Sequence, residues 1–314
     1  MPPSQPRHRG PKCCKGPWNY SRSQKSGRRT LSVCLPFDML FVMKCLALLA
    51  ISRALLGQTA APIVTAPPYA MPPSVAARLG PSDRVLFGKL MRVGLEAAWA
   101  VVSSEGYPQC YINELHPLNT GRRMVGRART IRYLPNRKDL RDKNYSQGPQ
   151  LNYRSAEEAL PGDVLVFDAG GETHSTVSGA MVTTRFVMRG GSGIMVDGCM
   201  RDIPDLTAMP IGIFLRCGHA SSVSPILMSV DYQVPVRIGG VTIVPGDILI
   251  GEDHGVLVIP ASIVDRVLER AMAHDEQEQF QRYLLLRGEP VYGVYPELNE
   301  ANRKKFEEFK KQKK

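Results

Sequence analysis

Two short apolar runs in the middle of the chain constrain the fold more strongly than any other feature. Residues 164–167 (Val-Leu-Val-Phe) follow the turn Pro161-Gly162-Asp163, and residues 194–196 (Ile-Met-Val) follow a glycine-rich stretch. Each run has the length and the unbroken apolar character of a buried strand. The segment between them reads as a helix that stops near two glycines. The order strand, helix, strand therefore indicates an α/β domain.

The exit of the second run carries candidate chemistry. Asp197-Gly198 is expected to break the strand, because glycine adopts backbone torsions that other residues resist. Arg201 follows, with a planar fork that fits a carboxylate in two-point contact. Asp202 offers a hard oxygen ligand suited to Mg²⁺. The pair could hold both ends of a metal-chelated oxoacid. A local ion pair that fixes a loop is the alternative.

A second anion site is expected just upstream, where Gly179 precedes a helix. Glycine leaves its backbone open to close approach by another group. The first N–H groups of a helix point out of its N-terminus and attract anions. These are the amides around Ala180, Met181 and Val182, so a carboxylate could lie between them and Arg201. The alternative is a glycine-rich connection that only permits tight packing.

The order and spacing of these segments resemble the RraA-like family, over about residues 86–295 and roughly two thirds of the chain. That family includes the class II, metal-dependent 4-hydroxy-4-methyl-2-oxoglutarate aldolases and the regulators of ribonuclease activity A. The polar insert at residues 133–154 has no match in the family pattern. The resemblance implies a single swivelling β/β/α-type domain with a central mixed sheet flanked by helices, plus a non-globular N-terminal extension. Further matching segments are residues 115–119, 125–128, 239–247 and 252–260.

The resemblance also assigns roles to particular residues. It places the metal ligand on Asp202 and the oxoacid-binding, catalytic arginine on Arg201. It implies Mg²⁺, Mn²⁺ or another divalent cation as cofactor. The backbone amides that hold the substrate carboxylate fall on Met181 and Val182. The whole substrate-binding turn is Gly179, Ala180, Met181 and Val182.

One further acid is implied to come from a neighbouring subunit. It matches Glu278, with Glu276 as the second choice. The resemblance therefore implies a homotrimer or a dimer of trimers. There is one departure from the family pattern, because Ala180 stands where the family usually carries an acid that orders water near the metal.

Two classes of function follow from the resemblance. The first is a divalent-metal-dependent lyase that acts on a small 2-oxoacid. It would perform aldol cleavage of 4-hydroxy-4-methyl-2-oxoglutarate-type substrates, oxaloacetate decarboxylation through a pyruvate enolate, or both. No lysine is placed to form a Schiff base. The second class is a non-catalytic, protein-binding regulator of ribonuclease activity. Arg201 and Asp202 favour the lyase, and Ala180 favours the regulator.

The positive charge of the chain is concentrated near its N-terminus. The formal net charge is +11, but residues 1–60 contain ten Lys or Arg residues and one acid, so the remainder is close to +2. So small an excess charge on the folded domain does not argue for a surface that binds nucleic acid. No nucleic-acid partner is therefore expected.

The seven cysteines show no regular spacing and no C-x-x-C pair with a matching His or Cys pair. They therefore predict no zinc site and suit a reducing compartment. Cys199 has no adjacent base and is interpreted as an ordinary packing residue. Asp163 and Asp247 follow Pro-Gly and are expected to accept hydrogen bonds from turn amides. His174, His219 and His254 could be general bases or ligands, but the sequence shows no partner for them.

Three parts of the chain are expected. Residues 1–75 form a basic, partly apolar extension and linker, residues 76–298 the RraA-like domain, and residues 299–314 a basic C-terminal helix or tail. The extension resembles a transit peptide, a signal with a long basic region, or an upstream extension of the gene model. Its apolar stretch is short and contains Lys44 and Arg53, so no stable membrane span is expected. The expected location is cytoplasmic or mitochondrial.

Local patterns predict the remaining elements. A polar loop is expected at residues 138–150. The segments around Gly239-Gly240 and 252–255 are expected to be hairpin turns. The expected helices are 82–102, 156–160, 261–287 and 299–311, and the expected strands are 125–133, 211–216, 234–238, 241–244, 247–250 and 256–259.

Overall fold

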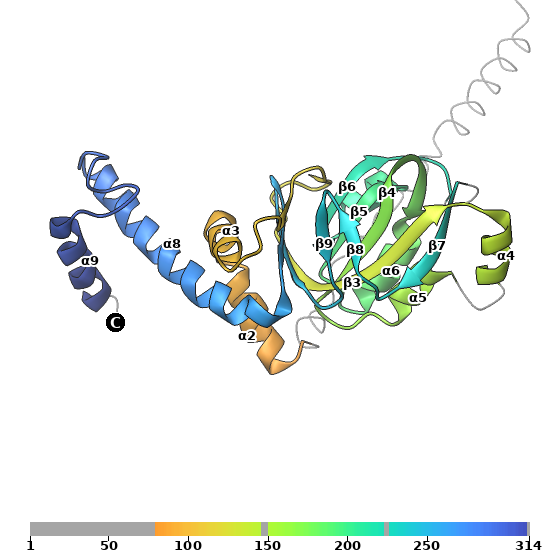
Figure 1. The fold of residues 1–314 in the computed structure, drawn as a ribbon, viewed down its shortest axis with the longest axis horizontal. Helices are drawn as coiled ribbons and strands as arrows, with labels where there is room; N and C mark the ends of the chain where they lie inside the picture. The colour runs from red at the N-terminus through yellow and green to blue at the C-terminus, as the bar shows by residue number, and fades with distance from the viewer. Residues whose placement is uncertain (1–78, 146–149, 223–225, 313–314) are drawn as a thin grey trace, which may run out of the picture. The chain divides into compact units, whose positions relative to one another are not determined.

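Four neighbouring parallel strands form the centre of the sheet on which the candidate site is built (Figure 1). The computed structural model describes residues 79–145, 150–222 and 226–312. By its contacts the chain divides into Met1–Val64 and Thr65–Lys314, and all described residues belong to the second unit. The central strands are β3 (Met124–Pro135), β4 (Asp163–Ser178), β5 (Gly193–Met200) and β6 (Gly212–Gly218).

Antiparallel strands extend this centre on both sides. Within the described ranges the order is β1-β11-β10-β3-β4-β5-β6-β2, and β7 pairs with part of β3. The strands β8 and β9 form a separate hairpin. The outer strands are β1 (Tyr111–Ile112), β2 (His116–Pro117), β7 (Leu227–Tyr232), β8 (Val236–Ile238), β9 (Val241–Ile243), β10 (Ile248–Glu252) and β11 (Gly255–Ile259).

Helices pack against one face of the sheet, and the β8–β9 hairpin lies on the other (Figure 1). The predicted α/β domain with a central mixed sheet flanked by helices is therefore confirmed. The helices are α2 (Pro81–Leu90), α3 (Leu95–Ser104), α4 (Lys138–Tyr145), α5 (Leu151–Glu157), α6 (Ala180–Met188), α7 (Ile203–Thr207), α8 (Val264–Leu286) and α9 (Glu300–Gln312), with a 3-10 turn, η2, at Ala261–Ile263.

The alternation of side chains along β4 explains how the two faces are filled. Leu165 and Phe167 are fully buried in the cluster that includes α5 and α6. Val164 and Val166 point to the opposite face, where the β8–β9 hairpin covers them. Successive strand residues face opposite sides, so a strand that is apolar at every position must be covered twice. The unbroken apolar run was the signal for this arrangement.

The helix expected at residues 82–102 is broken into α2 and α3. The break lies at Gly94, whose N–H donates to Asp275 Oδ2 at 2.8 Å. A Cβ at this position would lie 2.8 Å from Asp275 Oδ1, so glycine permits the contact. Both helices and α8 then share one core cluster that contains Leu90, Ala98 and Val267. The long-range contact with Asp275 is invisible to local periodicity.

The expectation of a loop at residues 138–150 is wrong for its first part, where α4 forms, and residues 146–149 lie outside the described ranges. This helix has no apolar periodicity, which is the signal on which helix prediction depends. Arg137 donates to both carboxylate oxygens of Asp139, at 2.9 and 2.6 Å. Asp139 also lies in the first turn, where its negative charge stabilises the helix by interacting with the positive end of the helix dipole. Strand β7 was missed altogether.

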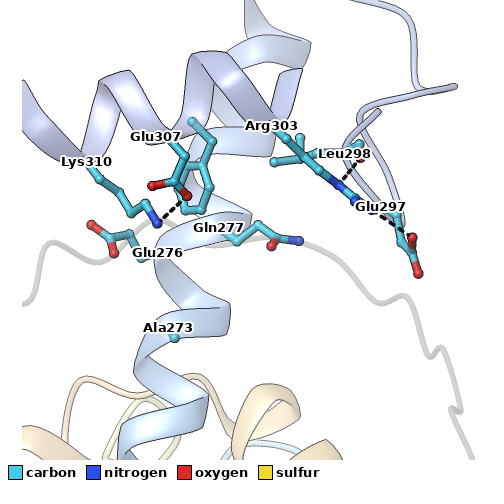
Figure 2. A pocket seen from close by; sticks show the side chains of 9 residues that line it. Ala273, Glu276, Gln277, Glu297, Leu298, Arg303, Glu307 and Lys310 are labelled. Carbon is cyan, nitrogen blue, oxygen red and sulfur yellow. Dashed lines mark hydrogen bonds and ion pairs between the residues drawn. The ribbon is translucent and has the colours of Figure 1, made fainter. Parts of the chain in front are cut away.

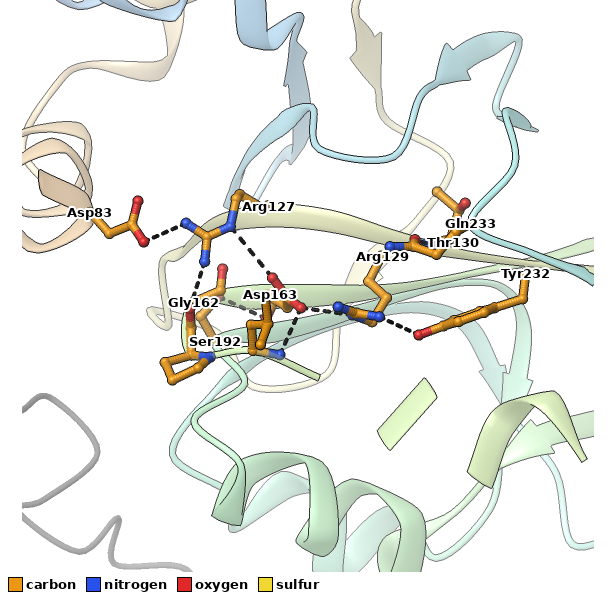
Figure 3. A network of polar contacts seen from close by, with 11 residues as sticks. Asp83, Arg127, Arg129, Thr130, Gly162, Asp163, Ser192, Tyr232 and Gln233 are labelled. Carbon is orange, nitrogen blue, oxygen red and sulfur yellow. Dashed lines mark hydrogen bonds and ion pairs between the residues drawn. The ribbon is translucent and has the colours of Figure 1, made fainter. Parts of the chain in front are cut away.

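A polar network fixes the start of β4 (Figure 3). The buried Asp163 carboxylate accepts from Leu160 N at 2.9 Å and from Arg129 Nε at 2.7 Å. Burial alone would lower the pKa of Arg129, but the hydrogen bonds and charge interactions with Asp163 and Tyr232 together outweigh burial and raise this pKa. The network continues from Arg129 to Tyr232. The predicted turn role of Asp163 is confirmed, and Asp247 plays the same part by accepting from Val244 N at 2.8 Å.

The N-terminal extension and its predicted targeting role lie outside the described residues. Among the helices of the described ranges, none is both long enough and apolar enough to cross a bilayer.

Candidate active site

Asp202 and the first residue of α6 meet at the exit of β5. Asp202 Oδ2 accepts a hydrogen bond from Ala180 N at 3.0 Å. Asp202 has φ 60° and ψ 40°, the left-handed region that few residues other than glycine adopt. Aspartate tolerates this conformation better than most side chains. The carboxylate is thus held at the N-terminus of α6 with its other oxygen, Oδ1, directed away from this bond.

Gly179 makes this approach possible. A Cβ at residue 179 would lie 2.5 Å from Asp202 Oδ2 and 2.8 Å from Arg201 Cγ. The φ of Gly179 is −155°, so the requirement comes from space and not from backbone conformation. The expectation that this glycine permits close approach is therefore supported by geometry, and the group that approaches is the Arg201–Asp202 pair itself.

Oxalate, a small dicarboxylate that can chelate a metal as a 2-oxoacid does, is a probe for the expected site. If the site binds it, we expect Gly179→Ala to weaken that binding by about tenfold or more, because displacing Asp202 and Arg201 removes contacts worth at least about 1.4 kcal/mol. Calorimetric titration with oxalate and Mg²⁺ would measure the loss. Gly88→Ala is the matched control, since a Cβ there meets nothing within 4 Å. Gly88 lies inside α2, so its replacement should stabilise the fold slightly and leave binding unchanged. Unaltered oxalate affinity in Gly179→Ala would contradict the close packing.

Arg201 and Asp202 form a long, solvent-exposed ion pair. Arg201 Nε lies 3.6 Å from Asp202 Oδ2, and the side chains are 48% and 37% exposed. Exposed pairs of this kind contribute about 0–1 kcal/mol to stability. The loop-fixing alternative is therefore geometrically present but energetically small. Both charged groups remain accessible to a ligand from solvent.

The first turn of α6 offers further donors next to the pair. Met181 and Val182 follow Ala180 in this turn, where N–H groups have no acceptor within the helix. The Met181 side chain is 81% exposed. The structure thus brings together Gly179, Ala180, Arg201 and Asp202, and it places the two remaining amides of the predicted turn beside them.

Glu278 is not brought to this cluster within one chain. It lies on α8, which packs mainly against α3. Figure 1 shows α8 leaving the sheet, with its C-terminal half well separated from α6 and β5. The assignment of Glu278 to the site of a neighbouring subunit stays a prediction. Glu278 instead lies with His274 and Asp275, which place one ligand atom each within 4.8 Å of one another.

Glu276, the second choice for that role, faces a different environment. It lines a cavity of about 580 Å³ between α8 and α9 (Figure 2). Two ion pairs lie at this cavity. Arg303 lies 3.3 Å from Glu297, and Lys310 lies 2.5 Å from Glu307. The cavity belongs to the α8–α9 packing, and no residue of the Arg201–Asp202 loop lines it.

Sequence reasoning missed the environment of the strand exit. Strand β5 continues through Asp197-Gly198 to Met200, so the expected break is wrong. Asp197 is buried and accepts from Arg216 Nε, which keeps the irregular part of the strand in the sheet. Cys199 forms a disulfide with Cys217, so its interpretation as an ordinary packing residue is also wrong. The two cysteines come from different strands, and no spacing rule predicts their pairing.

The other candidate residues have local partners. His174 lies 3.1 Å from Glu172 Oε1 on an exposed turn. His219 Nδ1 accepts from Ser221 N at 3.1 Å. His254 occupies the predicted turn between β10 and β11 and lies 3.2 Å from Glu96. Each of these three histidines therefore has a partner within the protein, and its position can be explained without a bound ligand.

The sequence model of the RraA-like family, described as Aldolase/RraA, matches residues 100–258. The chain belongs to this family. The match contains β3, β4, α6, β5 and the whole Arg201–Asp202 loop. The polar helix α4 also lies inside it, in the insert that had no counterpart in the expected pattern.

Relatives carry names from this family. A protein of Halalkalibacterium halodurans, provisionally named 4-hydroxy-4-methyl-2-oxoglutarate aldolase, is 34% identical over 169 residues, which cover 52% of this chain and 74% of that protein. Protein DlpA of Legionella pneumophila is 31% identical over 159 residues, but this chain spans only 25% of its length.

Solved structures agree with the fold of the RraA-like domain. RraAS2 of Streptomyces coelicolor, described as an unusual member of the RNase ES inhibitor RraA family, is 32% identical with a TM-score of 0.59. The match covers 64% of this chain and 98% of RraAS2. An uncharacterized protein of Pseudomonas syringae has a TM-score of 0.58 at 22% identity. The match covers 67% of this chain and 96% of that protein, and at this identity it supports the fold alone.

Proposed function

We propose that this protein is a divalent-metal-dependent lyase that acts on 2-oxoacids. One observation carries the proposal: Arg201, Asp202 and the N-terminus of α6 converge around Gly179, with Asp202 Oδ2 3.0 Å from Ala180 N. A permanent cation, a carboxylate and outward-pointing amides are the groups that a metal-chelating oxoacid needs. The aldolase name of a 34% identical relative supports the same reaction class.

The donor set fits a hard divalent cation such as Mg²⁺ or Mn²⁺. Asp202 commits Oδ2 to Ala180 N and is 37% exposed, so Oδ1 can bind a cation that keeps several waters. Mg²⁺ is commonly held by one or two carboxylates plus water and substrate oxygens. A bound cation would supply Lewis-acid stabilisation of the charge that develops on the oxoacid during carbon–carbon cleavage.

The chain's own residues would bind and orient the substrate. The Arg201 guanidinium would take the substrate carboxylate in two-point contact. The N–H groups of Met181 and Val182 would donate to the same carboxylate from the helix N-terminus. Fixing the carboxylate sets the direction of the bond to be broken, which lowers the entropic part of the barrier.

We expect Arg201→Lys to weaken 2-oxoacid binding by about 1–3 kcal/mol, because lysine keeps the charge and loses the planar fork. The Michaelis constant for oxaloacetate and the inhibition constant for oxalate should both rise. Arg185→Lys serves as a control, because Arg185 also lies on α6 but makes its two-point contact with Glu157 of α5, on the exposed surface. This change should leave both constants unaltered. Unchanged constants in Arg201→Lys would rule out the assigned role.

We further propose that the active form is a homotrimer or a dimer of trimers in which Glu278 completes the site of the adjacent subunit. Large apolar side chains remain exposed beyond the middle of α8, including Leu286 at 83% and Tyr292 at 90%. Exposed apolar side chains mark contact surfaces between proteins where they gather into one patch. A cyclic assembly with a head-to-tail interface would bring α8 of one subunit toward another.

A protein-binding regulator of ribonuclease activity is the second candidate. Ala180 favours it, because the resembled aldolases usually carry an acid there that orders water near the metal. The 32% identity to RraAS2, over 98% of that chain, favours it as well. A reaction mixture of the purified chain with oxaloacetate, coupled pyruvate detection, and Mg²⁺ or excess chelator separates the two. Pyruvate release that is faster than in an enzyme-free mixture with the same Mg²⁺, and that excess chelator stops, supports the lyase. Equal rates with and without enzyme would leave the regulator as the better proposal.

A further inference from the structure

Cys199 on β5 and Cys217 on β6 lie directly opposite each other in neighbouring parallel strands. Their Cα atoms are 4.6 Å apart, within the range that a disulfide can bridge. The structure joins them across 18 residues of sequence. Cys110, by contrast, is a free cysteine that is 2% exposed, and burial raises the pKa of its thiol to about 11.

An irregularity in β5 creates this pairing. Val196 pairs with Leu215, and the next pair is Cys199 with Cys217, so β5 has one more residue than β6 between the two pairs. Such a bulge re-aims the side chains that follow it. Asp197 lies inside the bulge and holds Arg216 of the facing strand. The fold thus brings the two cysteines together in the segment where the regular strand ladder is interrupted.

The cysteine pair lies at the base of the candidate active-site loop. Arg201 follows Cys199 by two residues, and its N–H donates to Ser178 O at 3.1 Å. His219 follows Cys217 by two residues, and its N–H donates to Met200 O at 3.0 Å. If β5 and β6 separated at the cysteines, the backbone hydrogen bonds that hold Arg201 and Asp202 in place would therefore weaken.

We propose that Cys199 and Cys217 form a thiol–disulfide switch that controls the order of the Arg201–Asp202 loop. The disulfide holds the strand exits together, and its reduction loosens the loop. The reduced state is also accommodated, because Thr173 O lies 3.3 Å from Cys199 Sγ and 4.0 Å from Cys217 Sγ and can accept from a thiol. The switch acts on the loop whether or not the site is a lyase.

The exposure of the two sulfurs sets the order of the chemistry. Cys217 is partly exposed, whereas Cys199 is 0% exposed. The Cys217 thiolate attacks a small disulfide, forms a mixed disulfide and releases one thiolate. The Cys199 thiol then attacks the Cys217 sulfur and its proton passes to the leaving thiolate, which forms the protein disulfide and releases the second small thiol. Two protein thiols are oxidised and one small disulfide is reduced to two thiols.

Glutathione disulfide is the probe for this order. The full chain is reduced, exposed to glutathione disulfide, alkylated and mapped by mass spectrometry of its peptides. In the unmodified sequence, Cys199 and Cys217 should lose their free thiols together while Cys110 keeps its own. Cys199→Ser should trap glutathione on Cys217. Cys217→Ser should leave Cys199 a free thiol, because its sulfur is buried.

Amide hydrogen exchange then reads the loop without substrate or metal, so the result does not depend on the proposed reaction. Reduction of the unmodified chain should speed exchange in residues 199–206 by about tenfold or more, because a cross-link restricts local opening. The same treatment should leave exchange in Cys217→Ser unchanged. Free thiols at both positions after oxidation, or identical exchange in the two redox states, would overturn the proposal.

Discussion

Replacing Asp202 with asparagine should abolish the enzyme-dependent part of pyruvate release from oxaloacetate in Mg²⁺ and leave the fold intact. Asparagine keeps an oxygen that can accept from Ala180 N, and it tolerates the left-handed backbone that Asp202 adopts. It loses the negative charge that would bind the cation. Loss of Lewis-acid stabilisation is worth several kcal/mol, so we expect kcat to fall by at least about a hundredfold.

The choice of asparagine over alanine follows from the structure. Alanine would remove the Ala180 contact and would also be strained at φ 60°. Its inactivity could then come from a displaced loop. Calorimetric Mg²⁺ titration and thermal unfolding should be recorded for both variants. Asp205→Asn is the control, since Asp205 lies in the following helix α7 and has no assigned role. An asparagine variant with full activity would place the metal elsewhere.

The local part of this site could be predicted from the sequence. A glycine before a helix, an apolar strand and an Arg-Asp pair after it are encoded within about 25 consecutive residues, and such local patterns report backbone geometry directly. The pattern could not predict that its first and last residues touch. The hydrogen bond from Ala180 to Asp202 joins residues 22 positions apart, and it exists because β4 and β5 lie side by side.

Other features were missed because their causes lie elsewhere in the fold. Asp197-Gly198 looks like a strand break, but Arg216 of the next strand neutralises the buried Asp197 and the strand continues. The α2–α3 break depends on Asp275, 181 positions away from Gly94. The disulfide depends on the register of two parallel strands. In each case a contact with a residue distant in sequence determined the structure, so a prediction from neighbouring residues alone was wrong.

Ala180 stands where the resembled family pattern has an acid, and the structure shows which of its groups is used. Its backbone N–H binds Asp202, which any residue except proline could provide, whereas its side chain is 8% exposed. An acid at this position would carry its charge into the space beside the α6 N-terminus. Without it, proton transfer would rely on groups brought from outside this cluster.

Mixing two inactive variants, Asp202→Asn and Glu278→Gln, should restore activity. Glu278 lies on α8, apart from the Arg201–Asp202 loop within one chain, so each proposed site would combine groups from two subunits. In a mixed head-to-tail trimer, one interface in three pairs an intact Asp202 with an intact Glu278. We therefore expect about a third of the unmodified activity after co-expression and two-tag purification of mixed trimers, since this purification removes oligomers built from one variant alone.

The matched control is Glu276→Gln, two residues earlier on α8, where the side chain lines the α8–α9 cavity. This variant should be active alone. Mass measurement by light scattering should accompany each assay, because dilution of the unmodified chain should lower specific activity and molecular mass together. Both results follow from an active site that is shared across the interface. A fully active monomer, or mixed oligomers that stay inactive although each variant folds, would exclude a shared site and return Glu278 to a structural role on α8.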